Sequence, residues 1–180
     1  MGDLQVWLVR TLGSAETIPS FMNSAWGWPI VESVHFIGVS LLVGTIGVFD
    51  LRLIGLARGI SIAALHKLIP WGIAGYAINA TTGAMFLVTA PDQYVFNPAF
   101  HLKLLFMAVA GFNALTFYLV AYRDATAPGA SEQAPRSAKI VAAVSLCMWV
   151  GVIICGRMIT FYRPGPCGPE GPGFLADCFP

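Results

Sequence analysis

The chain has 180 residues, of which 57% are hydrophobic and 11% are charged, and its mean hydropathy is +0.73. A water-soluble domain needs about 25% charged residues to cover its surface, so most of this surface is expected to face hydrocarbon. The net charge is only +1 and no cluster of basic residues occurs, which excludes a nucleic-acid-binding surface. We therefore expect an integral membrane protein whose partner is the lipid bilayer and not a nucleic acid.

The first segment, residues 3–12, reads DLQVWLVRTL and repeats apolar residues at the spacing of one helical face. The apolar stripe consists of Leu4, Trp7, Leu8 and Leu12. This pattern predicts a short N-terminal amphipathic helix that lies on the outer face of the membrane or docks on the rest of the protein. A frayed terminus without a stable helix is the alternative.

Four apolar windows follow, and each reaches the length of roughly 20 residues that a bilayer core requires. They cover residues 29–49, 68–89, 100–122 and 140–162. Asn97 is suited to cap the third window, and Pro98 fits its first helical turn. Lipid offers no partners for backbone hydrogen bonds, so each window is expected to be a helix. The predicted fold class is an all-α four-transmembrane-helix bundle, a single membrane domain over residues 1–180 with an irregular, Pro/Gly-rich tail at 163–180.

The distribution of basic residues predicts how the bundle is oriented. The segments after the first and third windows hold six of them, namely Arg52, Arg58, Lys67, Arg123, Arg136 and Lys139. The opposite side holds Arg10, Lys103, Arg157 and Arg163. Because cytoplasmic loops carry the excess of Lys and Arg, both termini are expected to face away from the cytoplasm.

Five ionisable residues occur at similar depth within the apolar windows. Glu32 and His35 lie three residues apart in the first window, hence on one helical face. His101 and Lys103 lie within about two turns of the outer end of the third window, and Arg157 lies at a similar depth in the fourth. Ionisable groups inside a membrane are costly and normally face the interior of a bundle. We therefore predict one polar site near the outer surface.

Two kinds of metal chemistry are compatible with these residues. His35 and His101 are candidate axial ligands of a haem b iron, with Lys103 and Arg157 as cofactor-binding partners of its propionates. Glu32 would then fix the tautomer of a ligating histidine. The same two histidines with one carboxylate are also a candidate site for a transition metal such as copper, iron or zinc.

Two further interpretations need no metal. Glu32, His35 and Arg157 are candidate catalytic residues that bind a quinone headgroup or relay protons, because an imidazole titrates near neutral pH. In the purely structural interpretation, Glu32 pairs with Arg157 or Lys103, and His35 hydrogen-bonds a neighbouring helix. The spacing of these residues leaves the alternatives open.

Polar residues elsewhere are interpreted as structural. His66, near the inner end of the second window, is expected to be solvated, and Asp50 and Arg52 to anchor the end of the first. Small and polar residues at helical spacing are expected to pack helices together, with amides bonded across the interface: Gly72, Tyr76, Asn79, Gly83, Asn113, Thr116 and Ser145. In the tail, Cys167 and Cys178 either form a disulfide or stay reduced, and the sequence does not decide between the two.

Five motifs in order carry a resemblance to known proteins: WPIVESVHFIGVSLLVG, DLRLIGLARG, IPWGIAGYAINATTGAMF, NPAFHLKLLFMAVAGFNAL and SLCMWVGVIICGRMITFY. Together they resemble an uncharacterised family of small bacterial four-span inner-membrane proteins, which implies an inner-membrane helical bundle and supplies no activity. In such a membrane, the distribution of basic residues described above predicts periplasmic termini. The resemblance places Glu32, His35 and Arg157 on family landmarks, but has a basic residue more often at the position of His101. NPAFHLK is also weakly similar to copper-resistance-type membrane proteins.

The function expected from these observations is that of an integral membrane subunit of a bacterial redox system. It would pass electrons through a haem or quinone site in the outer leaflet, together with a protein partner or further copies of itself. A non-enzymatic membrane scaffold or assembly subunit is one alternative. A transport protein for a metal or small solute is the other.

Overall fold

The computed structural model describes residues 2–14, 16–56, 59–122 and 134–162, and within them all regular structure is helical. The tail predicted to be irregular, with Cys167 and Cys178, lies outside the described residues. The prediction of an all-helical fold is therefore confirmed for the described part of the chain.

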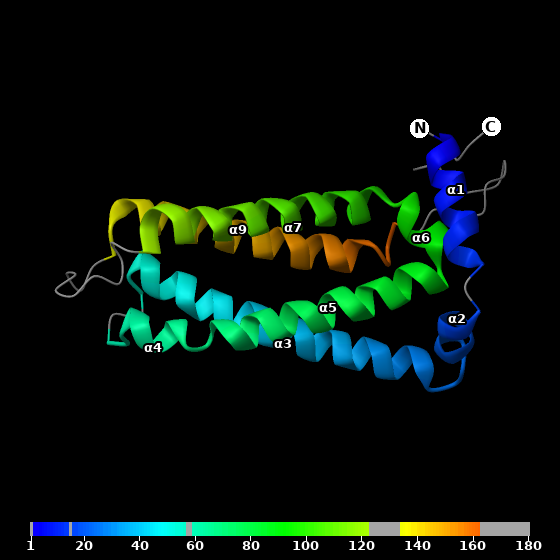
Figure 1. Cartoon of the computed structure of the whole chain (residues 1–180), viewed down its shortest axis with the longest axis horizontal. Helices are drawn as coiled ribbons and strands as arrows, with labels where there is room; N and C mark the ends of the chain where they lie inside the picture. The colour runs from blue at the N-terminus through cyan, green and yellow to red at the C-terminus, as the bar shows by residue number, and fades with distance from the viewer. Residues whose placement is uncertain (1, 15, 57–58, 123–133, 163–180) are drawn as a thin grey trace.

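Four long helices run along the length of the molecule (Figure 1). They are α3 (Gly27–Ile54), α5 (Ile69–Thr89), α7 (Pro98–Thr116) and α9 (Arg136–Met158). A π-helical turn, η1 (Phe117–Ala121), continues α7. Short helices lie at the two ends: α4 (Ile62–His66) at one, which we call the α4 end, and α1 (Gly2–Gly13), α2 (Thr17–Met22) and α6 (Pro91–Val95) at the other, which we call the α6 end.

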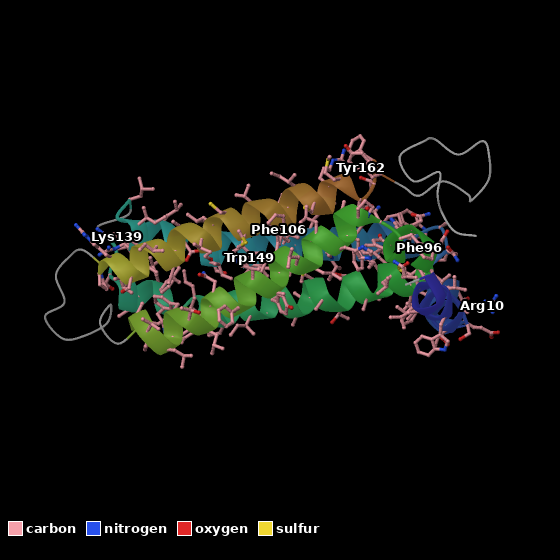
Figure 2. The ribbon with its side chains drawn as sticks, turned by 90° about the horizontal axis from the view of Figure 1, so that it is seen from above. Arg10, Phe96, Phe106, Lys139, Trp149 and Tyr162 are labelled. Carbon is pink, nitrogen blue, oxygen red and sulfur yellow. The ribbon has the colours of Figure 1, made fainter. Side chains whose placement is uncertain are left out.

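Three of the long helices are long and apolar enough to cross a membrane, namely α3, α9 and the continuous helix Pro98–Ala121. The fourth expected span corresponds to α5, which is not one of these three. Polar residues such as Tyr76 and Asn79, together with several Gly and Thr residues, lower its mean hydropathy. Figure 2 shows the charged side chains of Lys139 and Arg10 at opposite ends, with Phe106 and Trp149 between them. This distribution is typical of a helix bundle that crosses a bilayer.

The helix boundaries differ from the expected windows at one important place. The first window was expected to end at residue 49, but α3 continues to Ile54 and stops at Gly55, whose φ of 110° ends the helix in the left-handed region. Asp50 and Arg52 therefore belong to the helix and are buried in it, so they are not anchors beyond its end. At the start of α7, the side chain of Asn97 accepts a hydrogen bond from the Ala99 backbone, as predicted for a cap.

The helices pack as two pairs, α3 with α5 and α7 with α9, and the pairs meet through α3 and α9. In the α3–α5 seam, a Cβ added to Gly75 would lie 2.7 Å from the Gly38 carbonyl oxygen. A Cβ on Gly72 would lie 2.6 Å from the Thr45 hydroxyl oxygen. The two backbones therefore approach closely only because these positions lack side chains.

The polar residues expected to bond across interfaces behave in different ways. The amide of Asn113 does cross, donating to the Val141 carbonyl of α9 over 2.9 Å. The amide of Asn79 instead donates to Gly75 in its own helix, and the Thr116 hydroxyl likewise bonds Phe112. Gly83 has no neighbour within 4 Å of an added Cβ, so its expected packing role is wrong.

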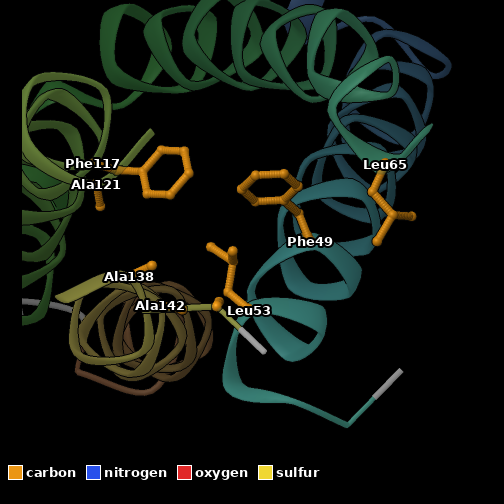
Figure 3. Close-up of a cluster of buried hydrophobic side chains, with 8 residues drawn as sticks. Phe49, Leu53, Leu65, Phe117, Ala121, Ala138 and Ala142 are labelled. Carbon is orange, nitrogen blue, oxygen red and sulfur yellow. The ribbon is translucent and has the colours of Figure 1, made fainter. Parts of the chain in front are cut away.

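Buried apolar side chains gather in two clusters of unequal size. The larger lies at the α4 end and contains Phe49, Leu53, Leu65, Phe117, Ala121, Ala134, Ala138 and Ala142. Figure 3 shows the rings of Phe49 and Phe117 pointing toward each other from α3 and η1, in an edge-to-face contact of 5.5 Å between ring centroids. The smaller cluster lies at the α6 end and contains Met22, Val31 and Phe86.

Candidate functional site

His35 is the residue around which the candidate site is built. It lies on α3, half-buried, with its ring nitrogen Nδ1 2.7 Å from the hydroxyl oxygen of Thr82 on α5. Its ring also meets the edge of the Phe86 ring, with 5.6 Å between the centroids. Both contacts come from the α3–α5 seam, so the close approach of these two helices fixes the position of the imidazole.

The hydrogen bonds of Thr82 allow the tautomer of His35 to be assigned. The Thr82 hydroxyl lies 2.7 Å from the carbonyl oxygen of Ile78, one turn earlier in α5. A carbonyl only accepts hydrogen bonds and a hydroxyl has one proton, so Thr82 donates to Ile78 and accepts from Nδ1–H of His35. We assign the lone pair of the neutral imidazole to Nε2, which is then the atom able to accept a proton or bind a ligand.

Lys103 is the second charged member of the site. It lies on α7, half-buried, and close enough to both His35 and Cys155 for its charge to act on them. Its ammonium nitrogen lies 3.7 Å from the place that a Cβ on Gly156 of α9 would occupy. The lysine head therefore lies against α9 at Gly156, at the distance of an ordinary van der Waals contact with an added Cβ.

All four long helices contribute to this arrangement, which we call the His35 group: His35, Thr82, Lys103 and Gly156. Of the residues predicted for the site, His35 and Lys103 lie within electrostatic range of each other. Thr82 was missed, although Asn79 and Thr82 form a polar stripe three residues apart on α5, and that stripe is the sequence signal for it.

Glu32, His101 and Arg157 are exposed. The guanidinium of Arg157 lies over the Phe161 ring, 5.0 Å from its centroid, in a cation–π contact within its own segment. The His101 ring lies beside its neighbour Phe100. In the part of the chain that the structure describes, no ion pair joins Glu32 to Arg157 or to Lys103. Their assignment as catalytic or cofactor-binding residues stays a prediction.

The candidate haem and metal ligands, His35 and His101, come from α3 and α7. Across residues 2–14, 16–56, 59–122 and 134–162, no group of three or more His, Cys, Asp or Glu side chains is arranged to hold a metal ion. His35 turns toward α5, and His101 makes no contact with it among the described residues. The assignment of His35 and His101 as haem or metal ligands stays a prediction.

His66 lies in a different environment from the solvated one expected for it. Its ring is half-buried among aromatic side chains of the α4 end, 5.0 Å from Tyr122 and 6.3 Å from Phe49 between centroids. Its Nε2 lies 3.2 Å from the Tyr118 hydroxyl. His66 therefore joins α4 to the π-helical turn, and it lies at the opposite end of the molecule from the α6 end.

Comparisons with models of protein families, with characterised proteins and with solved structures find no match to this chain. The resemblance to a bacterial inner-membrane family stays a prediction. The functional proposal therefore depends on the side chains of the His35 group and on the apolar character of the helices around them.

Proposed function

We propose that this protein is an integral membrane subunit of a bacterial redox system and that the His35 group binds a quinone headgroup. The observation that carries the proposal is an imidazole whose Nδ1 is fixed by Thr82, which leaves Nε2 as an acceptor within electrostatic range of the Lys103 ammonium. These polar groups come from different helices and lie between apolar segments. The reduced form of a quinone fits these groups, because a hydroxyl on its apolar ring donates to Nε2 and the other ring oxygen accepts from Lys103.

Each member of the group has a defined role in this proposal. The ammonium of Lys103 donates a hydrogen bond to a quinone carbonyl oxygen, and Nε2 of His35 accepts one from a quinol hydroxyl. Oxidation of a quinol releases two electrons and two protons. His35 takes the first proton on Nε2, the second passes to water at the membrane surface, and a redox partner protein accepts the electrons.

The proposal includes a membrane arrangement. All four long helices, α5 among them, cross a bacterial inner membrane, and the α6 end with both termini faces the periplasm. The charge distribution supports this orientation, because Arg136 and Lys139 lie at the α4 end, which becomes the cytoplasmic side. The His35 group then lies in the outer leaflet, and α1, with Leu4 and Trp7 exposed, lies on the periplasmic membrane surface.

A binding measurement tests the proposal directly. The protein is reconstituted in lipid nanodiscs and titrated with a short-chain ubiquinol under anaerobic conditions. We expect His35→Leu to weaken binding at least about tenfold, because it removes both the acceptor and the bond to Thr82. His101→Leu is the matched control, since this exposed histidine is expected to leave affinity unchanged.

Two results would overturn the proposal. If wild type and His35→Leu bind the ubiquinol with equal affinity, the His35 group is not a quinone site and is only a structural element of a scaffold. A Soret absorption band that shifts on reduction with dithionite, and is lost in His35→Leu, would assign haem in place of quinone.

A further inference from the structure

The α4 end contains a buried carboxyl group that the proposed quinone site does not use. Asp50 of α3 is 5% exposed, and its carboxyl oxygen Oδ2 has no hydrogen-bond partner among the described residues. Ser145 of α9, 8% exposed, is the hydroxyl group that lies within reach of this carboxyl group. Phe49 and Leu53, on either side of it in α3, both belong to the larger apolar cluster.

The position of Asp50 separates it from the His35 group. Asp50 follows His35 by fifteen positions in the same helix, which corresponds to about 22 Å at the rise of an α-helix. Asp50 instead lies where α3 meets α9, the contact through which the two helix pairs join. The π-helical turn η1 is adjacent, since Phe117 packs on Phe49, and such turns occur frequently at functional sites.

Several charged or titratable groups surround this end of the bundle: Arg52 of α3, His66 of α4, Tyr118 and Tyr122 at η1, and Arg136 and Lys139 of α9. Arg52 directs its Nε–H to the carbonyl of Ile60, and His66 is bonded to Tyr118. Within the described ranges, none of these groups forms an ion pair with Asp50.

A buried carboxylate without a cationic partner is costly, whereas the neutral carboxylic acid avoids most of that cost. In membrane helices, ionisable residues that face the bundle interior commonly mark proton pathways. The orphaned Oδ2 fits a group that carries a proton and needs no counter-ion.

We propose that Asp50 is a proton-binding site at the junction of the two helix pairs. Its carboxyl group is protonated in the folded protein, and the proton is released when the α3–α9 contact opens. Because ionisation would place an unpaired charge in this contact, the protonation state of Asp50 controls how firmly the two pairs associate. This inference does not depend on quinone binding.

Infrared spectroscopy tests this site. In lipid vesicles at neutral pH, we expect the wild type to show the C=O stretching band of a protonated carboxyl group, shifted downward in D2O and absent in Asp50→Asn. Ser145→Ala should raise the frequency of this band, because the acid then loses its hydrogen-bonding neighbour. Asp92→Asn, which alters an exposed carboxylate on α6, should leave the band unchanged.

The experiment also defines what would overturn the inference. If folded wild type and Asp50→Asn have the same spectrum in the carboxylic acid region, Asp50 is ionised and is not a proton site. Should Asp50→Asn fail to fold, wild type containing ¹³C-labelled aspartate gives the same test. An unshifted carboxylic acid region on labelling would then refute the proposal.

Discussion

At the α4 end, Phe49, Leu53 and Phe117 belong to a large apolar cluster, whereas at the α6 end the buried cluster consists of Met22, Val31 and Phe86. The larger cluster lies where the two helix pairs are pressed together by fully buried alanines of α9. Beside the smaller one, the His35 and Lys103 side chains remain half-buried. The two helix pairs therefore share a large apolar core at the α4 end, whereas at the α6 end the core is small and polar side chains remain partly exposed.

Truncating one large aromatic residue at each end tests this comparison and should give the largest effect. We expect Phe49→Ala to lower the free energy of unfolding by about 4 kcal/mol, because it empties the centre of the larger cluster. Phe86→Ala should cost about 3 kcal/mol, since Trp28 and Met85 are partly buried and can close over the space. Unfolding by SDS in micelles, followed by circular dichroism, measures both. A larger loss in Phe86→Ala would reverse the comparison.

The close contact of α3 with α5 at Gly38, Gly72 and Gly75 lies between the two ends, and it gives the next prediction. In Gly75→Leu, a side chain would meet the Gly38 carbonyl and the Leu42 backbone nitrogen, each 2.7 Å from the new Cβ. We expect a loss of about 3 kcal/mol in the same assay, together with loss of quinone binding because α5 carries Thr82.

Gly83→Leu is the matched control on the same helix, since an added Cβ there has no neighbour within 4 Å. Its stability should stay within about 0.5 kcal/mol of wild type. If both glycine variants unfold equally, the seam is not determined by close backbone approach.

The smallest effect is expected from the hydrogen bond that fixes His35. Thr82→Val removes the acceptor of Nδ1–H and should cost about 1 kcal/mol. Thr81→Val is the control, because its hydroxyl is exposed and bonds only its own helix. Nitrogen NMR of the His35 ring should show the Nδ1–H tautomer in wild type and in Thr81→Val but a mixture in Thr82→Val. An unchanged tautomer in Thr82→Val would refute the assignment.

Much of the architecture was predictable because apolar windows and caps are local signals. The windows correspond to the four long helices, and Asn97 caps α7 as its side chain and position indicated. The continuation of α3 through Asp50 and Arg52 was not predictable from the apolar window, because charged residues end such a window. In the structure, tertiary contacts bury both residues within the helix. α9 supplies those contacts for Asp50, from a segment far along the chain.

The site was only partly predictable, because it depends on how the helices are rotated about their axes. Glu32 and His35 are about 60° apart around α3, which the sequence places on one face. The Gly38–Gly75 contact sets the rotation so that His35 meets α5 while Glu32 stays exposed. No single-helix pattern contains that information, which explains why the expected Glu–His–Arg cluster is not formed by direct contacts among the described residues.

Asn97 is fully buried, and besides capping α7 its amide donates to the carbonyls of Ile159 and Tyr162 at the end of α9. One side chain thus fixes the vertical register of two antiparallel helices. A slip by a single residue would displace α9 by about 1.5 Å along its axis. Gly156 would then move away from the ammonium of Lys103. The contact between the Lys103 head and α9 is consequently determined by an amide six residues away in the sequence.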